Sequence, residues 1–449
     1  MRHRPPTRSQ MLDALFVAPI LHEIAHDLSD VGRRRRKHPL ALHLAFGAMA
    51  RLFGSANRLD AELAEPTTWE AILLRYNEGA ERHRFGVRAD DHARPLLADT
   101  YRHVRDHLTS PATLEDLLES FTTHSVALAQ SIGLIVENGK GSRTRPHPSR
   151  TIYGDGTIVR PLYSESSTGR RDPDAEEHVR HDGAVYGNDL VMVSTRGDTP
   201  HQRMILAVGR VHERGHEADV AIDIVRDVVA VAGSGVQAVV YDGAFRGVHH
   251  ETLMSELGLV VVNKVHAAAA NDAGRLHRAL PLGEWHHVVR RATCTHTLVA
   301  HNGSVHDVTF DDAGALVLSP PLRRHQVRRY ERADGRFRFS LGVRVPCPRE
   351  GFVAWISPHP QGRERGFGRP DQLRLVPESD ELFPLLYGLR NDSESINSRY
   401  KGTLVARRAA ASGWRRQVLD LVSWALLVNS LAVSTSCAPS SWERGTPRV

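Results

Sequence analysis

Lysine and cysteine are scarce in this chain of 449 residues. Arginine supplies nearly all of the 58 basic side chains, because lysine occurs only at positions 37, 140, 264 and 401. The three cysteines form no C-x-x-C pair, which excludes a disulfide scaffold. An odd, small number of cysteines favours a reducing compartment, so we expect a cytoplasmic protein.

A long uninterrupted apolar run is also absent from the sequence. The most apolar stretch, residues 417–435, contains Asp420 and Asn429, and its apolar residues recur with helical periodicity. The apolar stretch near the N-terminus contains Asp13 and His22 and is followed by no small-residue cleavage site. We therefore expect a core helix, an amphipathic helix and no membrane segment.

The composition is that of a globular protein with a small excess of basic residues. Hydrophobic residues make up 41% of the chain, enough for more than one core, and we expect roughly two to four domains. The balance of 58 Lys and Arg against 52 Asp and Glu is mildly basic. This balance allows a polyanionic partner such as nucleic acid without requiring one.

The N-terminal part of the sequence has helical periodicity. It is clearest in the stretches 40–53, 67–76 and 113–136. Residues 1–140 therefore predict an all-α domain, and Thr113 followed by Asp116 resembles a capping box. Gly, Ser, Pro and Arg dominate the next stretch, so residues 141–150 predict a linker.

Part of this helical region is compatible with a helix-turn-helix. Residues 124–135, HSVALAQSIGLI, have its rhythm of short helix, glycine and apolar residues. Packing within a helical bundle explains the same pattern equally well. The two interpretations stay open from the sequence.

From residue 151 the pattern changes to β-strands. Three strand-like runs come first, followed by a helix, a short strand, a second helix and a final strand up to residue 266. The order β-β-β-α-β-α-β is that of a ribonuclease-H-like core, an α/β fold with a mixed sheet. We expect residues 379–436 to complete this core with a returning helix and further C-terminal helices.

The two parts of this core are separated by residues 267–378, which predict a β-rich insertion. Apolar and polar residues alternate there, and Asn302 and Asp334, each followed by glycine, are hairpin turn signals. Basic and aromatic residues alternate in its segments LRRHQVRRY and GRFRF, a pattern that favours DNA contact. Residues 437–449 predict a frayed tail.

Three acidic residues stand where the predicted core brings distant segments together. Asp155 lies in the first strand, Asp242 ends the fourth strand, and Glu394 belongs to the returning helix. Neighbouring strands would place the two aspartates side by side. Three carboxylates offer the oxygen ligands that Mg²⁺ prefers, and Mn²⁺ can substitute for it.

Each acidic residue also has a purely structural interpretation. Asp-Gly is a common turn dipeptide, so Asp155 and Asp242 could each form a turn. Glu394 alone could be a surface glutamate. The conjunction of the three residues at these positions favours a cation site.

The segment that contains Glu394 holds a regular set of polar residues. At intervals of three, four and seven it has Tyr387, Arg390, Glu394 and Lys401. On a helix these side chains would share a stripe about 60° wide. Gly388 costs a helix about 1 kcal/mol, so we expect the helix to begin only near Asn391.

These residues resemble the DDE transposases of bacterial insertion sequences, in the group defined by the signature Y-(2)-R-(3)-E-(6)-K. The four residues of the segment match that signature in type and spacing. Asp155 and Asp242 match the two aspartates that precede it. The resemblance covers residues 150–435 by architecture and indicates the ribonuclease-H-like, or retroviral-integrase, superfamily.

The resemblance implies metal-dependent cleavage at transposon ends followed by strand transfer into target DNA. It implies that the three acidic residues hold Mg²⁺, and that Tyr387, Arg390 and Lys401 contact DNA near the cleaved end. The implied partners are double-stranded DNA, at terminal inverted repeats and target sites, and a second copy of the chain in a synaptic complex. The N-terminal helical domain would recognise the inverted repeats, and the protein would associate with the cytoplasmic nucleoid.

Two other functions are compatible with the same residues. One is a metal-dependent nuclease of the same core that transfers no strand. The other is a domesticated, catalytically silent copy that binds DNA as a repressor, although a binding protein has no need for three converging carboxylates. A zinc site is disfavoured, because Cys294, His296, His301 and His306 match no usual zinc spacing.

Overall fold

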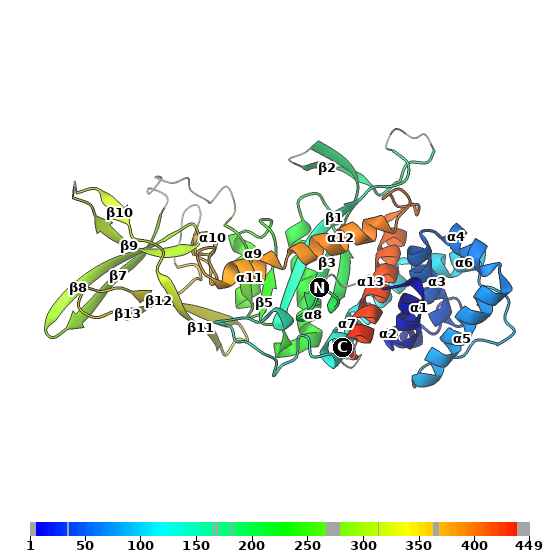
Figure 1. Ribbon diagram of the computed structural model, residues 1–449. Helices are drawn as coiled ribbons and strands as arrows, with labels where there is room; N and C mark the ends of the chain where they lie inside the picture. The colour runs from blue at the N-terminus through cyan, green and yellow to red at the C-terminus, as the bar shows by residue number, and fades with distance from the viewer. Residues whose placement is uncertain are drawn as a thin grey trace, which may run out of the picture.

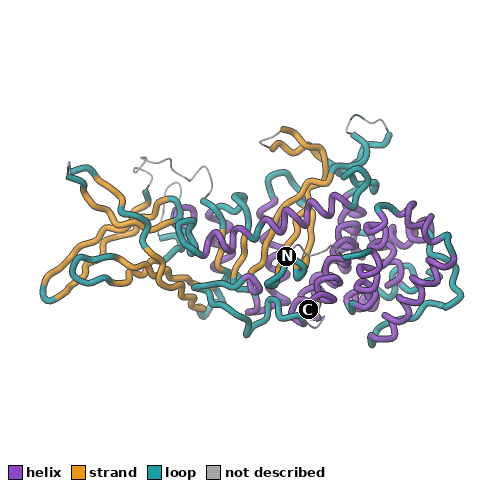
Figure 2. Tube along the Cα trace, in the orientation of Figure 1, coloured by secondary structure: helices purple, strands orange, loops and turns teal. Residues whose placement is uncertain are grey.

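The computed structural model describes residues 6–33, 36–164, 166, 169–180, 183–265, 279–312, 314–361 and 368–437. The molecule is elongated, with helices at one end, a mixed sheet flanked by helices in the middle, and long β-hairpins at the other end (Figure 1). In Figure 2 the helices gather at one end of the molecule and the strands in the middle and at the other end. The protein is therefore of the mixed α/β class, as the sequence predicts.

Helices fill the N-terminal part of the described chain. They are α1 (Arg8–Val17), α2 (Ile20–Asp27), α3 (Leu40–Phe53), α4 (Ala56–Leu63), α5 (Pro66–Arg82), α6 (Ala98–Leu108) and α7 (Pro111–Ser131). The predicted stretch 40–53 matches α3. The predicted capping box is wrong, because α7 begins at Pro111, and the hydroxyl of its N-cap Ser110 donates to the Thr113 hydroxyl over 2.9 Å.

The helix-turn-helix interpretation of residues 124–135 is wrong. Helix α7 runs unbroken to Ser131, and Gly133, with φ of 81°, ends it. The following residues lead through a short 3₁₀ turn into the first strand rather than into a second helix. Leu117, Phe121 and Val126 of α7 are buried, and the helix packs against the sheet and α8.

Within the described residues, three antiparallel and two parallel strand pairings form the mixed sheet. Its elements are β1 (Thr151–Val159), β2 (Glu176–Arg180), β3 (Gly183–Arg196), β4 (Arg203–Arg210), α8 (Glu217–Ala232), β5 (Ala238–Val240), α9 (Gly247–Ser255) and β6 (Val260–Val262). Strands β4, β3, β1, β5 and β6 lie side by side in that order. The predicted sequence of elements is present, with β2 as an addition that pairs with the start of β3.

Strand β1 is the centre of the sheet. It pairs antiparallel with β3, where Asp155 opposes Met192, and parallel with β5, where Tyr153 is in register with Val240. Strands β5 and β6 consist of buried β-branched and alanine residues, as expected of parallel strands covered on both faces. Both edges of β1 are therefore fixed by hydrogen bonds.

The C-terminal helices return to this sheet. They are α11 (Leu382–Gly388), α12 (Asn391–Gly402) and α13 (Trp414–Cys437). Helix α13 packs against α1, α3, α7 and β4, so a continuous apolar core extends from the N-terminal helices to the sheet. Within the described residues α13 is long and apolar enough to cross a membrane, but 72% of that apolar window is buried in the protein, as expected of the predicted core helix. Residues 438–449 of the predicted tail lie outside the described residues.

The described residues of the insertion form two antiparallel sheets and the short helix α10 (Arg369–Gln372). One contains β7 (Leu280–Val289), β8 (Ala292–His301), β9 (Ser304–Phe310) and β10 (Leu316–Leu318), and the other contains β11 (Arg323–Glu331), β12 (Phe337–Val345) and β13 (Phe352–Ile356). The predicted turns are confirmed, because Asn302 and Gly303 join β8 to β9 and Gly335 lies between β11 and β12, all three with positive φ. The turn at Arg290 and Arg291 also has positive φ, without the residues that signal it. Residues 266–278 and 362–367 lie outside the described residues.

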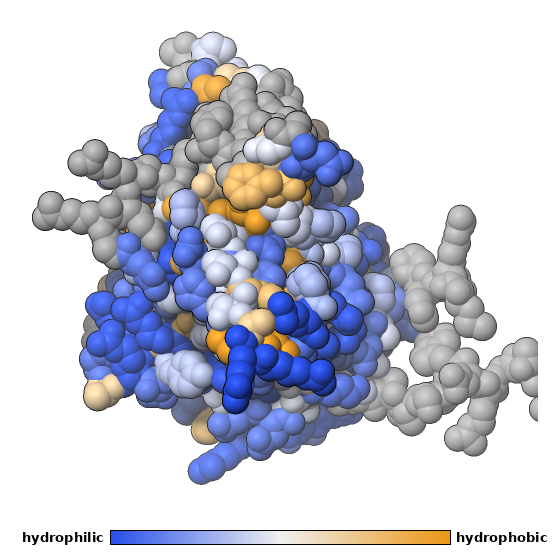
Figure 3. All heavy atoms as spheres, turned by 90° about the vertical axis from the view of Figure 1, so that its left-hand side faces the viewer, coloured by the Kyte–Doolittle hydropathy of each residue, from blue (hydrophilic) through white to orange (hydrophobic). Residues whose placement is uncertain are grey.

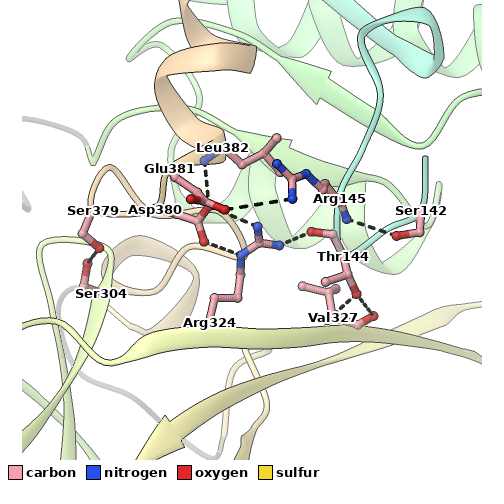
Figure 4. Close-up of polar contacts among 10 residues, drawn as sticks. All are labelled: Ser142, Thr144, Arg145, Ser304, Arg324, Val327, Ser379, Asp380, Glu381 and Leu382. Atoms are coloured by element: carbon pink, nitrogen blue, oxygen red, sulfur yellow. Dashed lines mark hydrogen bonds and ion pairs between the residues drawn. The ribbon is translucent and has the colours of Figure 1, made fainter. Parts of the chain in front are cut away.

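A buried ion pair connects the insertion to the start of α11 (Figure 4). The guanidinium of Arg324 donates to the carboxylate of Asp380 over 2.6 Å and 3.1 Å, and both side chains are nearly buried. Arg324 also donates to the carbonyl of Thr144, in the segment predicted as a linker. The Thr144 hydroxyl and the backbone of Val327 exchange two hydrogen bonds. Three segments distant in sequence thus meet at one arginine.

The charge of Asp380 is stabilised at this junction. Burial opposes ionisation, but hydrogen bonds from Arg324 and from the backbone N–H of Leu382 outweigh it and lower the pKa of Asp380. The ionised Asp380 carboxylate therefore stabilises the fold at pH values above its pKa in the unfolded state. This stabilisation is lost as the pH falls through its lowered pKa in the folded state.

Replacing Arg324 by alanine leaves the Asp380 carboxylate buried without its partner. We expect the free energy of unfolding at pH 7 to fall by about 3 kcal/mol, measured by urea denaturation. The exposed neighbour Arg323 provides the matched control, and Arg323→Ala should change stability by less than about 0.5 kcal/mol. Equal effects of the two substitutions would contradict this account of the junction.

Candidate active site

The sheet register brings Asp155 and Asp242 together. Asp155 lies in the middle of the nine-residue strand β1, so the turn interpretation of this residue is wrong. Strands β1 and β5 are in parallel register up to Tyr153 and Val240. Asp242 follows β5 by two residues, as Asp155 follows Tyr153, so continuing the register puts the two aspartates side by side.

Asp242 has a turn role as well as its place beside Asp155. One oxygen of its carboxylate accepts a hydrogen bond from the backbone N–H of Ala244 over 2.8 Å. This bond closes the turn that leads to α9. The turn fixes the carboxylate at the end of β5 and leaves its second oxygen available for a ligand.

Helices α11 and α12 carry the residues of the predicted stripe. Helix α12 begins at Asn391, as the sequence predicts, and Leu389 and Arg390 between the two helices keep right-handed helical φ and ψ. Hydrogen bonds from residue i+3 to residue i continue through this connection. The two helices therefore run nearly end to end (Figure 1), and Tyr387 stays close to the side of Arg390 and Glu394.

Arg390 binds two of the three predicted carboxylates. Its guanidinium donates to Asp155 over 3.3 Å and to Glu394 over 2.5 Å. The side chains of Arg390 and Asp155 are 16% and 14% exposed, whereas that of Glu394 is 53% exposed. A guanidinium therefore already provides a positive charge between the central strand and the returning helix.

Asp155 lies in an unfavourable environment for a negative charge. Burial raises the pKa of Asp155 to about 7, and the charges of Asp242 and Glu217 act in the same direction, against Arg390 and a hydrogen bond from Asn397. A bound cation would stabilise the ionised form of this buried carboxylate more strongly than that of an exposed carboxylate.

Two further polar residues influence Asp155 and escaped the sequence reasoning. The side-chain amide of Asn397 donates to Asp155 over 2.7 Å, and Asn397 follows Arg390 by two helical turns. Glu217, in the first turn of α8, accepts a hydrogen bond from the buried Tyr241 hydroxyl over 2.8 Å. The helical spacing was a usable signal for Asn397, whereas nothing in the local sequence indicated Glu217.

The glycines that flank Asp155 make room for these neighbours. A Cβ atom at Gly156 would lie 2.5 Å from the carboxylate of Glu217, and one at Gly154 would lie 2.5 Å from the Tyr241 ring. Side chains alternate along a strand, so Glu217 and Tyr241 lie on the face of β1 opposite to Asp155. The sequence YGDG is therefore required by close packing rather than by a turn.

The three basic and aromatic residues of the signature have different surroundings. Tyr387 stacks on Phe383 with ring centroids 4.9 Å apart, and both Lys264 and Arg390 place their charged groups 5.7 Å from its ring centroid. Lys401 is in the last turn of α12, about 10 Å along the helix axis from Glu394. Tyr387 and Arg390 thus lie at the carboxylates, and Lys401 lies further along the same helix.

An ion-pair network holds α12 against the sheet. The carboxylate of Asp392, in the first turn of α12, accepts hydrogen-bonded ion pairs from Arg196 of β3 and Arg203 of β4. These side chains are between 11% and 14% exposed. Arg203 also donates to the hydroxyl of Ser395 over 3.3 Å. The position of Glu394, between Asp392 and Ser395, is fixed by its neighbours.

Within the described ranges, no three His, Cys, Asp or Glu side chains are already arranged to hold a metal ion. Asp155, Asp242 and Glu394 nevertheless fit Mg²⁺ by chemistry, because they offer oxygen ligands and one of them is buried with a raised pKa. Two histidines of the grouping that the sequence analysis weighed for zinc have other partners. His296 binds Asp307, and His306 binds the carbonyl of Ser319.

Comparisons with known proteins add no relative. A scan against models of protein families finds no match for this chain, and a search of curated proteins finds no similar sequence. The resemblance to DDE transposases therefore depends on the residues and the topology described above.

Replacing Asp155 by asparagine should stabilise the metal-free protein at alkaline pH. Between about pH 4 and 7 the carboxyl is protonated in the folded state and ionised in the unfolded state, so the stability of the natural chain falls by ~1.4 kcal/mol per pH unit. Asparagine cannot ionise. In EDTA, the free energy of unfolding of the variant should rise relative to that of the natural chain by about 2–4 kcal/mol as the pH goes from 4 to 8.

Urea denaturation of both proteins at several pH values measures this difference. The substitution Asp198→Asn, at an exposed position, is the control and should show no comparable trend. If the stability difference between the Asp155→Asn variant and the natural chain does not change with pH, the buried Asp155 carboxyl does not have a raised pKa.

Proposed function

We propose that the protein belongs to the ribonuclease-H-like enzymes that act on phosphodiester bonds through bound divalent cations. The order β4-β3-β1-β5-β6 supports this class, because its first three strands along the sheet are antiparallel and its last three are parallel. Helices lie between the parallel strands in the chain, and α12 returns to the central strand. This is the topology that the sequence order predicts for such a core.

Within this class, we propose a DDE transposase that cleaves transposon ends and transfers the strand into target DNA. One observation carries the proposal. Asp155 of β1 and Asp242, two residues past the end of β5, continue the register of these paired strands. The signature helix brings Glu394 to the guanidinium that also binds Asp155. Turn formers and surface glutamates in unrelated roles have no reason to converge in this way.

The chemistry of the proposed site follows from its donor atoms. Asp155, Asp242 and Glu394 would hold Mg²⁺, or Mn²⁺ in its place. When bound, such cations neutralise charge on the attacking and leaving oxygens of a phosphodiester. Asn397 orients the Asp155 carboxylate, and Arg390 must leave at least one of its two carboxylates when a cation binds.

The arginine that a cation would displace is also suited to DNA. A guanidinium offers a planar fork of donors for phosphate oxygens, and Tyr387 beside it offers a hydroxyl and a stacking face. Lys264, over the ring of Tyr387, adds a charge that the sequence did not indicate. Lys401 would bind phosphate further along the DNA.

The insertion provides a further surface for DNA. Along β11 the side chains of Arg323, His325 and Arg328 are exposed, and this end of the molecule is largely hydrophilic with small apolar areas (Figure 3). The proposal includes double-stranded DNA with terminal inverted repeats, target DNA, a second copy of the chain in the synaptic complex, and a nucleoid-associated cytoplasmic location.

A strand-transfer assay with Asp242→Ala tests the proposed function. With Mg²⁺ and DNA carrying the element's own ends, the natural chain should cleave and join DNA, and EDTA should abolish both reactions. The variant should lose cleavage by at least about 10³-fold, because a carboxylate ligand is missing, while end binding is kept. The exposed Asp116 provides the control, and Asp116→Ala should leave both reactions unchanged.

The outcomes of this assay separate the candidate functions. Cleavage without joining by the natural chain would indicate a nuclease. Salt-sensitive binding with neither reaction would indicate a repressor. Cleavage that survives in the Asp242→Ala variant would show that the assignment of the acidic residues is wrong.

Arg390→Ala separates the two roles of this arginine. Removing the guanidinium frees Asp155 and Glu394, so Mn²⁺ should bind at least as tightly as it binds the natural chain, measured by calorimetry. DNA cleavage should fall by at least about tenfold, because a phosphate contact is lost. Arg399→Ala, at an exposed position of α12, should change neither quantity. Weaker Mn²⁺ binding by Arg390→Ala would contradict the competition between guanidinium and cation.

A further inference from the structure

A tight turn follows the signature helix α12. It runs from Val405 to Arg408, and the backbone N–H of Arg408 donates to the carbonyl of Val405 over 2.9 Å. The two central residues, Ala406 and Arg407, have φ of 49° and 61°. Positive φ at both central positions is the mark of a type I′ turn, which usually has glycine, asparagine or aspartate there. Alanine and arginine in this conformation strain the backbone, and such strain is frequent at functional sites.

Backbone pairing anchors this turn to the central strand of the sheet. Directly after the turn, the N–H of Ala409 donates to the carbonyl of Arg160 over 2.8 Å, and its carbonyl accepts from the N–H of Leu162 over 2.8 Å. The guanidinium of Arg408 donates to the carbonyl of Pro161 over 3.3 Å. These partners directly follow β1, the strand that carries the first aspartate of the site (Figure 1). The turn is therefore fixed relative to the carboxylates.

The turn directs the side chain of Arg407 back onto α12. Its guanidinium donates to the hydroxyl of Ser398 over 3.4 Å. Ser398 follows Glu394 by one helical turn, so the two side chains lie about 40° apart around the axis and about 6 Å apart along it. Lys401 lies about 20° from Glu394 around the same axis. Arg407 thus joins the helix face that carries the acidic residue.

The surroundings of Arg407 leave its charge available for a ligand. Both Arg407 and Ser398 are exposed. Within the described part of the chain, Arg407 has no carboxylate partner, and its guanidinium bonds the Ser398 hydroxyl alone. One long hydrogen bond between exposed groups contributes little to stability. This bond by itself is a weak reason to keep arginine in a strained turn.

Capping of α12 is the structural alternative for this arginine. Basic side chains near the C-terminus of a helix can bind its last carbonyls and interact favourably with its dipole. The carbonyls of Tyr400 and Lys401 already accept the N–H groups of Thr403 and Leu404, over 2.9 Å and 3.2 Å. Arg407 reaches a hydroxyl one turn before the end of the helix instead, so capping does not explain its position.

We propose that Arg407 and the Ser398 hydroxyl bind a backbone phosphate of the DNA strand that runs along α12. A guanidinium offers a fork of donors for phosphate oxygens, and the hydroxyl offers one more donor. Phosphates of one strand advance by about 3.4 Å along the DNA axis. The phosphate at Ser398 therefore lies about two nucleotides from the phosphate at the carboxylates. This inference rests on the proposed function and adds a contact that lies outside the sequence signature.

The salt dependence of DNA binding by Arg407→Gln tests the contact. Binding of a random-sequence duplex is measured by fluorescence anisotropy in EDTA, over a range of salt concentrations. The variant should bind more weakly, and the slope of log K against log[salt] should decrease in magnitude by about one, because one phosphate contact is lost.

The control is Arg399→Gln, which removes an exposed arginine of α12 about 140° around the axis from Glu394. Its slope should equal that of the natural chain. An unchanged slope in Arg407→Gln, or equal decreases in the two variants, would overturn the proposal.

A neutral phosphate analogue locates the contact along the strand. In DNA that carries the element's own ends, a single methylphosphonate is moved through the positions around the cleaved bond. About two nucleotides from this bond it should weaken binding by the natural chain as much as Arg407→Gln does, and it should weaken binding by Arg407→Gln no further. Losses that add up at every position would contradict the contact.

Arg407→Gly distinguishes a phosphate contact from a structural role. Glycine adopts positive φ without strain, so this variant should have a higher urea midpoint than Arg407→Gln. Its DNA binding should nevertheless be as weak as that of Arg407→Gln. If both variants unfold at lower urea than the natural chain and bind DNA as tightly, the arginine is structural and the proposal is wrong.

The outcomes also separate this inference from the proposed function. A decreased slope in Arg407→Gln, with neither cleavage nor joining by the natural chain, would support the phosphate contact and contradict the transposase. Strand transfer by the natural chain with unchanged DNA binding by Arg407→Gln would support the transposase and contradict the contact. A natural chain that binds no DNA would contradict both.

Discussion

When it ionises, the carboxyl of Asp155 places a negative charge on the central strand of the sheet, beneath a helix, and this charge requires a positive partner. Arg390 supplies that partner here and shares it with Glu394. Burial of the charge explains the raised pKa of Asp155 and the amide contact from Asn397. The placement of α12 follows from the same requirement, because Arg390, directly before its first turn, brings the guanidinium to β1.

A second buried charge fixes the same helix in register. Asp392 accepts ion pairs from β3 and β4, so the first turn of α12 is tied to two strands while Arg390 ties it to a third. Rotation of α12 by one residue would turn Asp392 away from both arginines and Glu394 away from the site. The helix therefore holds the acidic residue in position before any DNA or cation binds.

Polar contacts, in addition to the polypeptide chain itself, connect the insertion to the rest of the molecule. Arg324 unites β11, the segment before β1 and the start of α11, which leads directly to Tyr387 and Arg390 (Figure 4). Within the insertion, the ring of Phe352 in β13 stacks on His287 in β7 and so joins the two sheets. A short series of contacts therefore links the β-hairpins to the segment that leads to the signature helix.

The sequence by itself determined the class of the fold, the order of strands and helices, two of the hairpin turns and the start of α12 near Asn391. These features are local, since side-chain periodicity, glycine and turn chemistry act over a few residues. It also singled out Asp155, Asp242 and Glu394, whose neighbourhood follows from strand order. Only the tertiary structure decided that Arg390 binds two of these carboxylates and that Asn397 and Lys264 join the site. It also decided that Glu217 packs behind Asp155, on the other face of β1. Those contacts depend on which faces of distant elements meet, and packing of the whole core sets that geometry, not any short stretch of sequence.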